Sequence, residues 1–509
     1  MLVLQTLYIL PPVFWVVQIL LIGGVFWAVK QIRSGLGLPV LVVLATVASW
    51  YVIDVLYNDY LHTYAMEFSS ASRDEAWWQI ALFLLVFLFL ATPVHQLINQ
   101  RSLRRSSQVL LLAKEGCDKP HIQWGLTRLL QACLIAWALL SLVAAFRLQG
   151  AVLYYFCPYL SYLADPWARD RIGAGFDYLL AVALHLHMFL AAMFGIVLAV
   201  MKNPKLRALA LFGVLTSWPY LIFGRTRNFM LAAVIPGVLV WVFLRLRAHI
   251  AVKIVVLVVL FSLVSAWFNF VMIHRDEDSI AAVFSQEGFN LEGHTNVHQE
   301  GLNMFGELCW INTFIDQGIY KPNGGKRYWA EIVNPIPRSI WPGKPLIGID
   351  YAILRGQGWE EQDASGAGVG ATIATGLIGQ GVVNYGQVFG PAFAAFLMCL
   401  WVAVLARLDL YGDSLGRIPL YSLGLILTFN LGRDITLLTL YTFIFGAMIV
   451  WMVEQMGLGK FSYAKTVPRS RARGMAPVPS VIFNGASLDS SPSDQGNHAP
   501  HSSSSARAD

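Results

Sequence analysis

The stretch Asn334-Pro-Ile-Pro-Arg-Ser-Ile-Trp-Pro-Gly-Lys-Pro345 interrupts an otherwise apolar chain and separates a long series of apolar runs from a short one. It contains four prolines, each of which fixes its own φ and disfavours a helical conformation of the residue before it. We therefore expect a rigid, extended loop that presents Arg338 and Lys344. Two cations held on a stiff chain suit the binding of an anion.

The composition on both sides of this loop is that of a membrane protein. Of the 509 residues, 57% are apolar and only 13% are charged, which leaves too little polar surface for a soluble globule of this size. The formal net charge of +6 is therefore expected to reflect the position of cations relative to a bilayer, and no nucleic-acid partner is predicted. The five cysteines lack metal-ligand or disulfide spacing, so neither a zinc site nor a disulfide framework is indicated, and no cofactor is expected.

The apolar runs predict an all-α, polytopic fold with about eleven transmembrane helices, since a helix needs about 20 mostly apolar residues to cross a bilayer. The first run is long enough to span and no small-residue cleavage site follows it, so we expect a retained helix rather than a signal peptide. The predicted spans are residues 8–29, 37–57, 76–98, 125–146, 175–201, 206–223, 228–246, 252–272, 385–407, 417–432 and 435–455.

The distribution of cations predicts the orientation of these spans. With the N-terminus outside, the inner loops carry fifteen Lys and Arg and the short outer loops carry seven, so the positive-inside rule places the C-terminus in the cytoplasm. The chain is then an N-terminal bundle of about eight spans (residues 1–272), a large periplasmic loop (273–384), a C-terminal bundle of about three spans (385–456) and a disordered, basic cytoplasmic tail (457–509).

The large outer loop contains sequence features that a simple linker would lack. Residues 301–319 have apolar residues at helical spacing, which predicts an amphipathic helix along the membrane surface. Tyr328, Trp329 and Trp341 are aromatics of the kind found at membrane interfaces. Residues 355–370 contain five glycines and several acids, which indicates a flexible flap. A surface domain without chemical function is the alternative interpretation.

Several arginines lie on the outer side against the charge bias. Gly224-Arg-Thr-Arg-Asn228 and Arg433-Asp434 form very short outer turns. Their arginines could snorkel to headgroups, or Arg433 could pair with Asp434. A guanidinium fork also binds phosphate with two hydrogen bonds, which favours a shared anion site. The candidate anion-binding residues are Arg225, Arg227, Arg338, Lys344, Arg355 and Arg433.

The sequence leaves the identity of a catalytic base open. A base needs reach and a suitable pKa rather than a fixed spacing, and each acid of the outer side could equally belong to a solvated surface. His294 and His298 could share a metal on a helix, but no third ligand is fixed by spacing. Of His185 and His187 in the fifth span, at most one is expected to line a cavity. The candidate acids are Asp276, Asp278, Asp350 and Asp434.

Residues 220–440 resemble the Wzy-type oligosaccharide repeat-unit polymerases, which are the O-antigen and exopolysaccharide polymerases. The most specific part of the resemblance is the segment Ile-Pro-Arg-x-x-Trp-Pro-x-Lys-Pro at 336–345. It is preceded by Gly-x-x-Tyr at 325–328 and followed by a glycine-rich run at 366–390. The Gly-Arg-x-Arg turn at 224–227 and the spacing from Arg355 to Gly366 also fit.

The resemblance implies a glycosyltransferase of the GT-C type in the bacterial inner membrane, without a bound metal or a nucleotide sugar. It would move a growing glycan from undecaprenyl pyrophosphate to a hydroxyl of the next lipid-linked repeat unit. The leaving lipid diphosphate would be met by the fixed cations named above, with Arg355 closing over the sugar. The implied partners are the lipid-linked oligosaccharide, membrane lipids, a chain-length regulator and a flippase.

Three alternatives stay open at this point. An O-antigen ligase uses the same donor with a different acceptor. A glycosyltransferase that adds one sugar from a lipid carrier is expected to have an acidic pair in the first outer loop, where Asp59, Asp74 and Glu75 form no convincing motif. A polysaccharide or lipid transporter is expected to carry ionisable residues or broken helices near the middle of the bilayer.

Overall fold

The structure is a computed structural model that describes residues 10–455 apart from fifteen gaps. The chain divides into two units, Met1–Ser462 and Tyr463–Asp509, and only the first contains described residues. The predicted cytoplasmic tail, residues 457–509, therefore lies wholly outside the described part of the chain. The gaps are residues 58–59, 103–104, 110–117, 119, 158–159, 162–163, 168–176, 224–226, 247, 274–302, 334–335, 337–339, 346–347, 357–372 and 413–415.

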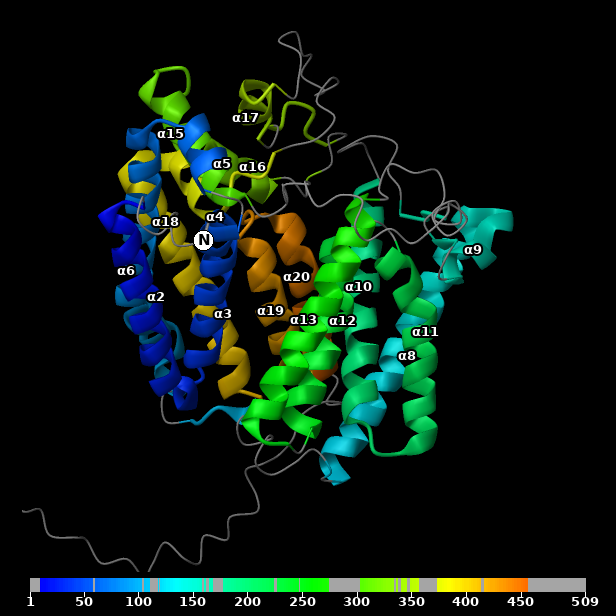
Figure 1. Ribbon diagram of the computed structural model, residues 1–509. Coiled ribbons are helices and arrows are strands. Elements are labelled where there is room, and N and C mark those ends of the chain that lie inside the picture. The colour runs from blue at the N-terminus through cyan, green and yellow to red at the C-terminus, as the bar shows by residue number, and fades with distance from the viewer. Residues whose placement is uncertain are drawn as a thin grey trace, which may run out of the picture. The chain divides into compact units, whose positions relative to one another are not determined.

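All regular secondary structure in the described residues is helical (Figure 1). Six helices are long and apolar enough to cross a membrane: α2 (Pro12–Lys30), α6 (Ser70–Asn99), α8 (Pro120–Leu148), α10 (Asp177–Val200), α11 (Pro204–Phe223) and α18 (Leu377–Leu410). Further apolar helices are α3 (Gly37–Val47), continued by η2 (Ala48–Ile53) and α4 (Asp54–Tyr57), α12 (Arg227–Val240), continued by η6 (Trp241–Arg245), α13 (Ile250–Ile273), α19 (Arg417–Leu431) and α20 (Leu437–Gln455).

The remaining helices are short and connect the apolar ones. They are η1 (Ile32–Ser34), α5 (Tyr60–Glu67), η3 (Gln100–Ser102), η4 (Gln149–Ala151), α9 (Val152–Phe156), α15 (Met304–Asp316), α16 (Lys326–Val333) and α17 (Ile349–Leu354). The predicted amphipathic helix of the large loop coincides with α15, which Asn303 caps by accepting a hydrogen bond from the Gly306 amide.

The predicted fold class is confirmed as all-helical in the described residues, with helix lengths that suit a membrane protein. Each of the eleven predicted spans coincides with one helix or with a continuous run of helices. How many of them cross a bilayer, and in which direction, stays a prediction.

The helices pack around two clusters of buried apolar side chains. One cluster joins α2, α3, α6, α15 and α18, and the other joins α8, α10, α11, α12, α19 and α20. Helices α10 and α12 approach closely at Gly195 and Gly237, where a β-carbon on Gly237 would lie 2.7 Å from the carbonyl carbon of Gly195. Small residues at such crossings are typical of membrane helices, which associate largely by close van der Waals packing.

Helix α18 is broken at Gly386, where φ is 82° and ψ is 179°. Gly381 and Gly390, on opposite sides of the break, are in close backbone contact: a β-carbon on Gly381 would lie 2.2 Å from the Gly390 carbonyl oxygen. Residues nine positions apart in a straight helix are about 13 Å apart, so the chain folds back here. We call residues 377–385 the α18 arm; its first eight residues are all buried. The predicted ninth span thus begins one residue before the break.

Contacts group the polar connections at two ends of the helices. At one end, Tyr64 donates a hydrogen bond to Asn303 Oδ1 (3.0 Å), and the Leu377 amide donates to the Gly432 carbonyl (3.0 Å). Tyr64 follows the second predicted span, Asn303 and Leu377 follow the eighth, and Gly432 ends the tenth; all three connections were assigned to the outer side. Helices α15 and α16 lie at this end and pack against α18 (Figure 1).

The other end gathers connections that were predicted to be inner. The Ser107 amide donates to the Arg33 carbonyl (3.1 Å), and the Val109 amide donates to Asp409 Oδ1 (2.9 Å). Arg417 forms an ion pair with Glu454 (2.7 Å). The described contacts therefore agree with the predicted alternation of loops, while the assignment of one end to the cytoplasm stays a prediction.

Candidate functional site

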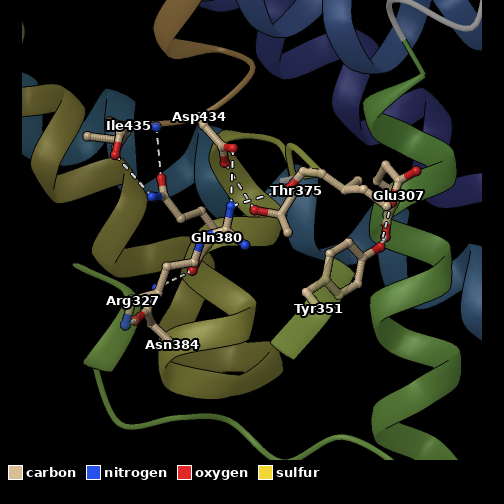
Figure 2. A network of polar contacts seen from close by, with 9 residues as sticks. Glu307, Arg327, Tyr351, Thr375, Gln380, Asn384, Asp434 and Ile435 are labelled. Atoms are coloured by element: carbon tan, nitrogen blue, oxygen red, sulfur yellow. Dashed lines mark hydrogen bonds and ion pairs between the residues drawn. The ribbon is translucent and has the colours of Figure 1, made fainter. Parts of the chain in front are cut away.

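A network of polar side chains lies where the large loop meets α18 and the turn between α19 and α20 (Figure 2). Its members come from five separate segments, and most of them are buried. A buried polar network in an apolar protein is costly unless its members satisfy one another, which makes this cluster the best candidate for a functional site. Its members are Glu307, Arg327, Tyr351, Thr375, Gln380, Asn384, Asp434 and Ile435.

The centre of the network is an ion pair between Arg327 and Asp434. Arg327 Nη2 lies 3.2 Å from Asp434 Oδ2, and only 2% and 12% of the two side chains are exposed. The hydroxyl of Thr375 donates to the other carboxylate oxygen (3.0 Å), and Arg327 Nη2 also reaches the Ile373 carbonyl (3.4 Å). Asp434 lies in the short turn that follows α19, so its carboxylate is at the end of the apolar helices.

The α18 arm positions both members of this pair. Asn384 Oδ1 accepts hydrogen bonds from the amides of Arg327 (3.2 Å) and Tyr328 (3.3 Å), which holds the start of α16. Gln380 exchanges two hydrogen bonds with the main chain of Ile435, donating from Nε2 (3.0 Å) and accepting at Oε1 (2.8 Å). Because Gln380 and Asn384 are one helical turn apart, one face of the α18 arm fixes Asp434 and Arg327 relative to each other.

Burial determines the electrostatics of the pair. It raises the pKa of Asp434 above the ordinary value for an aspartate, and the nearby charge of Arg327 opposes this shift. The guanidinium is only partly satisfied, because Arg327 Nε and Nη1 are buried and have no hydrogen-bond partner among the described residues. An unsatisfied buried donor costs about 1–3 kcal/mol, so the N–H groups of these two nitrogens could each serve a ligand.

A second part of the network surrounds Glu307 on α15. The carboxylate accepts hydrogen bonds from the Tyr351 hydroxyl and from Arg355 Nε (3.3 Å) and Nη2 (3.1 Å). The Arg355 guanidinium also lies over the ring of Trp310, 4.6 Å from its centroid. Burial and the charge of Glu307 hold the pKa of the Tyr351 hydroxyl well above its usual range, so that it acts as a donor.

Four of the predicted site residues have described side-chain partners. Asp434 belongs to the central pair, with Arg327 and not Arg433 as its hydrogen-bonded partner. Arg355 is held by Glu307, so it does not project freely as expected of a flexible flap. Lys344 is buried, and its Nζ donates to the Ile336 carbonyl (2.8 Å), which ties the proline-rich loop to itself instead of presenting the cation. Asp350 accepts a hydrogen bond from Tyr320 (2.7 Å).

The other predicted residues are less defined. Arg433 is exposed beside Asp434. Arg227 begins α12, which packs against α19, but its side chain is outside the described residues. Arg225, Arg338, Asp276 and Asp278 lie entirely outside the described residues.

Arg327 was missed by the sequence interpretation, although it lies inside the Gly-x-x-Tyr segment between Gly325 and Tyr328. A cation on a short amphipathic segment is usually solvated, and nothing local indicates that this one is buried. Gln380 and Asn384 did carry a usable signal, since two amides four residues apart in an apolar, glycine-rich run share one face of a helix.

The two histidines of α10 are both buried and both have partners. His187 contacts the Tyr155 hydroxyl (3.0 Å) and the Ser217 carbonyl (2.7 Å), and His185 contacts Thr442 Oγ1 (3.1 Å). These contacts indicate a structural role. Among the described residues no group of three His, Cys, Asp or Glu could hold a metal ion, and His294 and His298 lie outside them.

Comparisons with known proteins found no family model, no curated protein and no solved structure that matches this chain. The fold and the site therefore define the class only broadly. The chain is an all-helical protein with the apolar helices of a membrane protein, and it carries a buried acid–guanidinium pair at one end of those helices.

Proposed function

We propose that the protein is a membrane glycosyltransferase that transfers a growing glycan from undecaprenyl pyrophosphate to a hydroxyl of a lipid-linked repeat unit. In this proposal eleven helices span the bacterial inner membrane, and the site faces the periplasm. The observation that carries the proposal is the Arg327–Asp434 pair, because it combines a carboxylate with a guanidinium that keeps donors without a partner among the described residues. The resemblance of residues 220–440 to Wzy-type polymerases supports it independently.

The reaction needs two groups that this pair supplies. The bond between the anomeric carbon and the phosphate oxygen breaks, and the acceptor oxygen forms the new glycosidic bond. The lipid diphosphate leaves with the bonding electrons, and a guanidinium that donates a hydrogen bond to it stabilises this charge. The acceptor hydroxyl loses its proton to a carboxylate. Asp434 suits that role, because a raised pKa makes it a stronger base than an exposed aspartate.

Further cations support a polymerase within this class. A polymerase holds two lipid diphosphates at once, as donor and as acceptor, and therefore needs more positive charge than an enzyme with one such substrate. Arg433 is exposed beside the central pair, and Arg227 begins a helix that packs against α19. Together with Arg225 and Arg338, which we assign to the same face, they provide cations for the second diphosphate.

One observation favours a different class, a transporter. Broken helices are typical of transporter binding sites, and α18 is broken at Gly386. In transporters such breaks lie near the middle of the bilayer. Here the α18 arm bonds to Gly432 just beyond the end of α19 and to the start of α16, which places it at the ends of the helices. We therefore prefer chemistry at the membrane surface to transport through it.

The products formed by cells without the protein test the proposal. Loss of a polymerase leaves single repeat units that are still transferred or exported, whereas loss of a ligase leaves long chains on undecaprenyl pyrophosphate. We expect single units in deletion cells and in Arg327→Ala cells. The matched control is Gln387→Ala, which removes only a contact with Asp316 at the edge of α18 (3.1 Å). Normal chain lengths in Arg327→Ala cells at normal protein abundance would contradict the proposal.

A further inference from the structure

Helix α17 lies against the guanidinium of Arg327. Gly348, which precedes α17, has a φ of 63°, and a β-carbon at this position would lie 3.1 Å from Arg327 Cζ and 3.2 Å from Nη1. Only glycine combines that backbone conformation with so close an approach. The main chain at the start of α17 therefore packs directly on the guanidinium, and Arg327 Nη1 has no hydrogen-bond partner among the described residues.

Polar contacts to the preceding part of the loop hold α17 in this position. Tyr351 and Arg355 both bond to Glu307 of α15, and Asp350 accepts a hydrogen bond from Tyr320, which follows α15. We call these contacts the α17 latch. A helix of six residues is not stable alone, so the position of α17 depends on the latch and on the burial of Tyr351.

The latch and the ion pair are parts of one assembly. Gly348 joins the two, because it packs on Arg327 Cζ and Nη1 and directly precedes the latch residues of α17. The latch residues bond to one another, whereas Arg327 Nη1 has no partner among the described residues. The α17 latch, whose members bond to one another, thus lies over a guanidinium that keeps a donor without a described partner.

We propose that α17 is a cover over Arg327, and that release of the α17 latch exposes the N–H groups of Nη1 to a phosphate oxygen of the substrate. The identity of the anion as a lipid diphosphate rests on the proposed function, whereas the cover rests only on the contacts given above. In the closed state the guanidinium stays on Asp434 and on the Ile373 carbonyl. In the open state Nη2 keeps its bond to Asp434 while Nη1 donates to the anion.

The rate at which phenylglyoxal, an arginine-selective reagent, modifies Arg327 in the purified full-length protein tests the cover. Mass spectrometry reports modification at each arginine. We expect Tyr351→Phe and Glu307→Gln to raise the rate at Arg327 roughly tenfold or more, because each removes a hydrogen bond that involves a charged group. The rate at exposed Arg433 should not change. Gln387→Ala is the matched control and should leave both rates unchanged, and melting temperatures identify variants that unfold globally.

The ligand is tested in the Tyr351→Phe protein with three probes: inorganic pyrophosphate, undecaprenyl pyrophosphate and phosphatidylglycerol. We expect both pyrophosphates to slow modification of Arg327 several-fold, with the lipid form acting at lower concentration. Protection by phosphatidylglycerol alone would indicate a headgroup site and overturn the assignment of the anion.

The outcomes separate the two proposals. An unchanged rate at Arg327 in both folded latch variants overturns the cover, whatever the protein's activity. A raised rate without protection by either pyrophosphate retains the cover and overturns the phosphate site. A raised rate with protection, in a protein that makes no polymer from lipid-linked repeat units, supports the site and refutes the polymerase function.

Discussion

Removing one member of the Arg327–Asp434 pair should cost more stability when the acid is removed than when the cation is removed. Both side chains are almost fully buried, and their closest atoms are 3.2 Å apart. In Asp434→Asn the guanidinium remains buried without a counter-charge, and a guanidinium does not release its proton to escape this penalty. We expect a loss of about 3–5 kcal/mol in the free energy of unfolding, the range for a broken buried ion pair.

Arg327→Met should be milder, since the remaining carboxyl can bind a proton. Burial already raises the pKa of Asp434, and the Thr375 hydroxyl still bonds to it. The expected loss is about 1–3 kcal/mol, the cost of one unsatisfied buried polar group. The double variant Arg327→Met/Asp434→Asn removes both charges, so its loss should be smaller than the sum of the single losses by about 2 kcal/mol or more.

The assay is equilibrium unfolding of the purified protein in mixed micelles of detergent and SDS, with all three variants compared with the parent. Arg433→Met is the matched control, because it removes a neighbouring cation that is exposed, and it should change stability by no more than about 0.5 kcal/mol. Additive losses, or a larger loss for Arg327→Met than for Asp434→Asn, would refute the claim that the two charges depend on each other.

Three further predictions concern the backbone, pH and sidedness. Gly386→Ala should destabilise the protein by about 1–3 kcal/mol, because its φ of 82° with ψ near 180° is strained for any other residue; Gly343→Ala, in open space, should be near neutral in the same unfolding assay. In Arg327→Met the pKa of Asp434 should rise further, so the folded state binds a proton that the unfolded state releases. The free energy of unfolding of this variant should then fall as pH rises from acid to neutral, and it should fall more steeply than in the parent. A difference in stability between variant and parent that does not change with pH would contradict this prediction. A cysteine at position 433 should react with an impermeant maleimide in intact cells, and one at position 105 only after permeabilisation; the reverse pattern would invert the topology.

Local patterns in the sequence predict the helices well because length and apolarity decide them. The runs that became α2, α6, α8 and α11 are each long enough to span a bilayer, and their ends carry polar residues. These features depend on residues close together in the chain. The contacts of Tyr64 with Asn303 and of Leu377 with Gly432 agree with the alternation of the predicted spans, whose orientation stays a prediction.

The site depends on distant residues, and the sequence predicted only part of it. Arg327 and Asp434 are 107 positions apart, and no local pattern indicates that this arginine is buried against this acid. The α18 arm is a second example. Its glycines were visible in the sequence, but its fold depends on distant contacts, such as the bond that Tyr51 accepts from the Ile378 amide (3.0 Å). Asp434, Arg355 and Lys344 were selected from charge on the predicted outer face, and their partners required the structure.

The most direct test of the account is a polymerisation assay with purified components. The full-length protein receives a lipid-linked repeat unit as its only substrate, without a sugar nucleotide or a divalent ion, and chain length and free undecaprenyl pyrophosphate are measured together. We predict chains of several repeat units, one released undecaprenyl pyrophosphate for each bond formed, and a loss of both in Arg327→Met. Failure to form any chain until a sugar nucleotide or a divalent ion is added, or equal chain growth by Arg327→Met, would contradict the account.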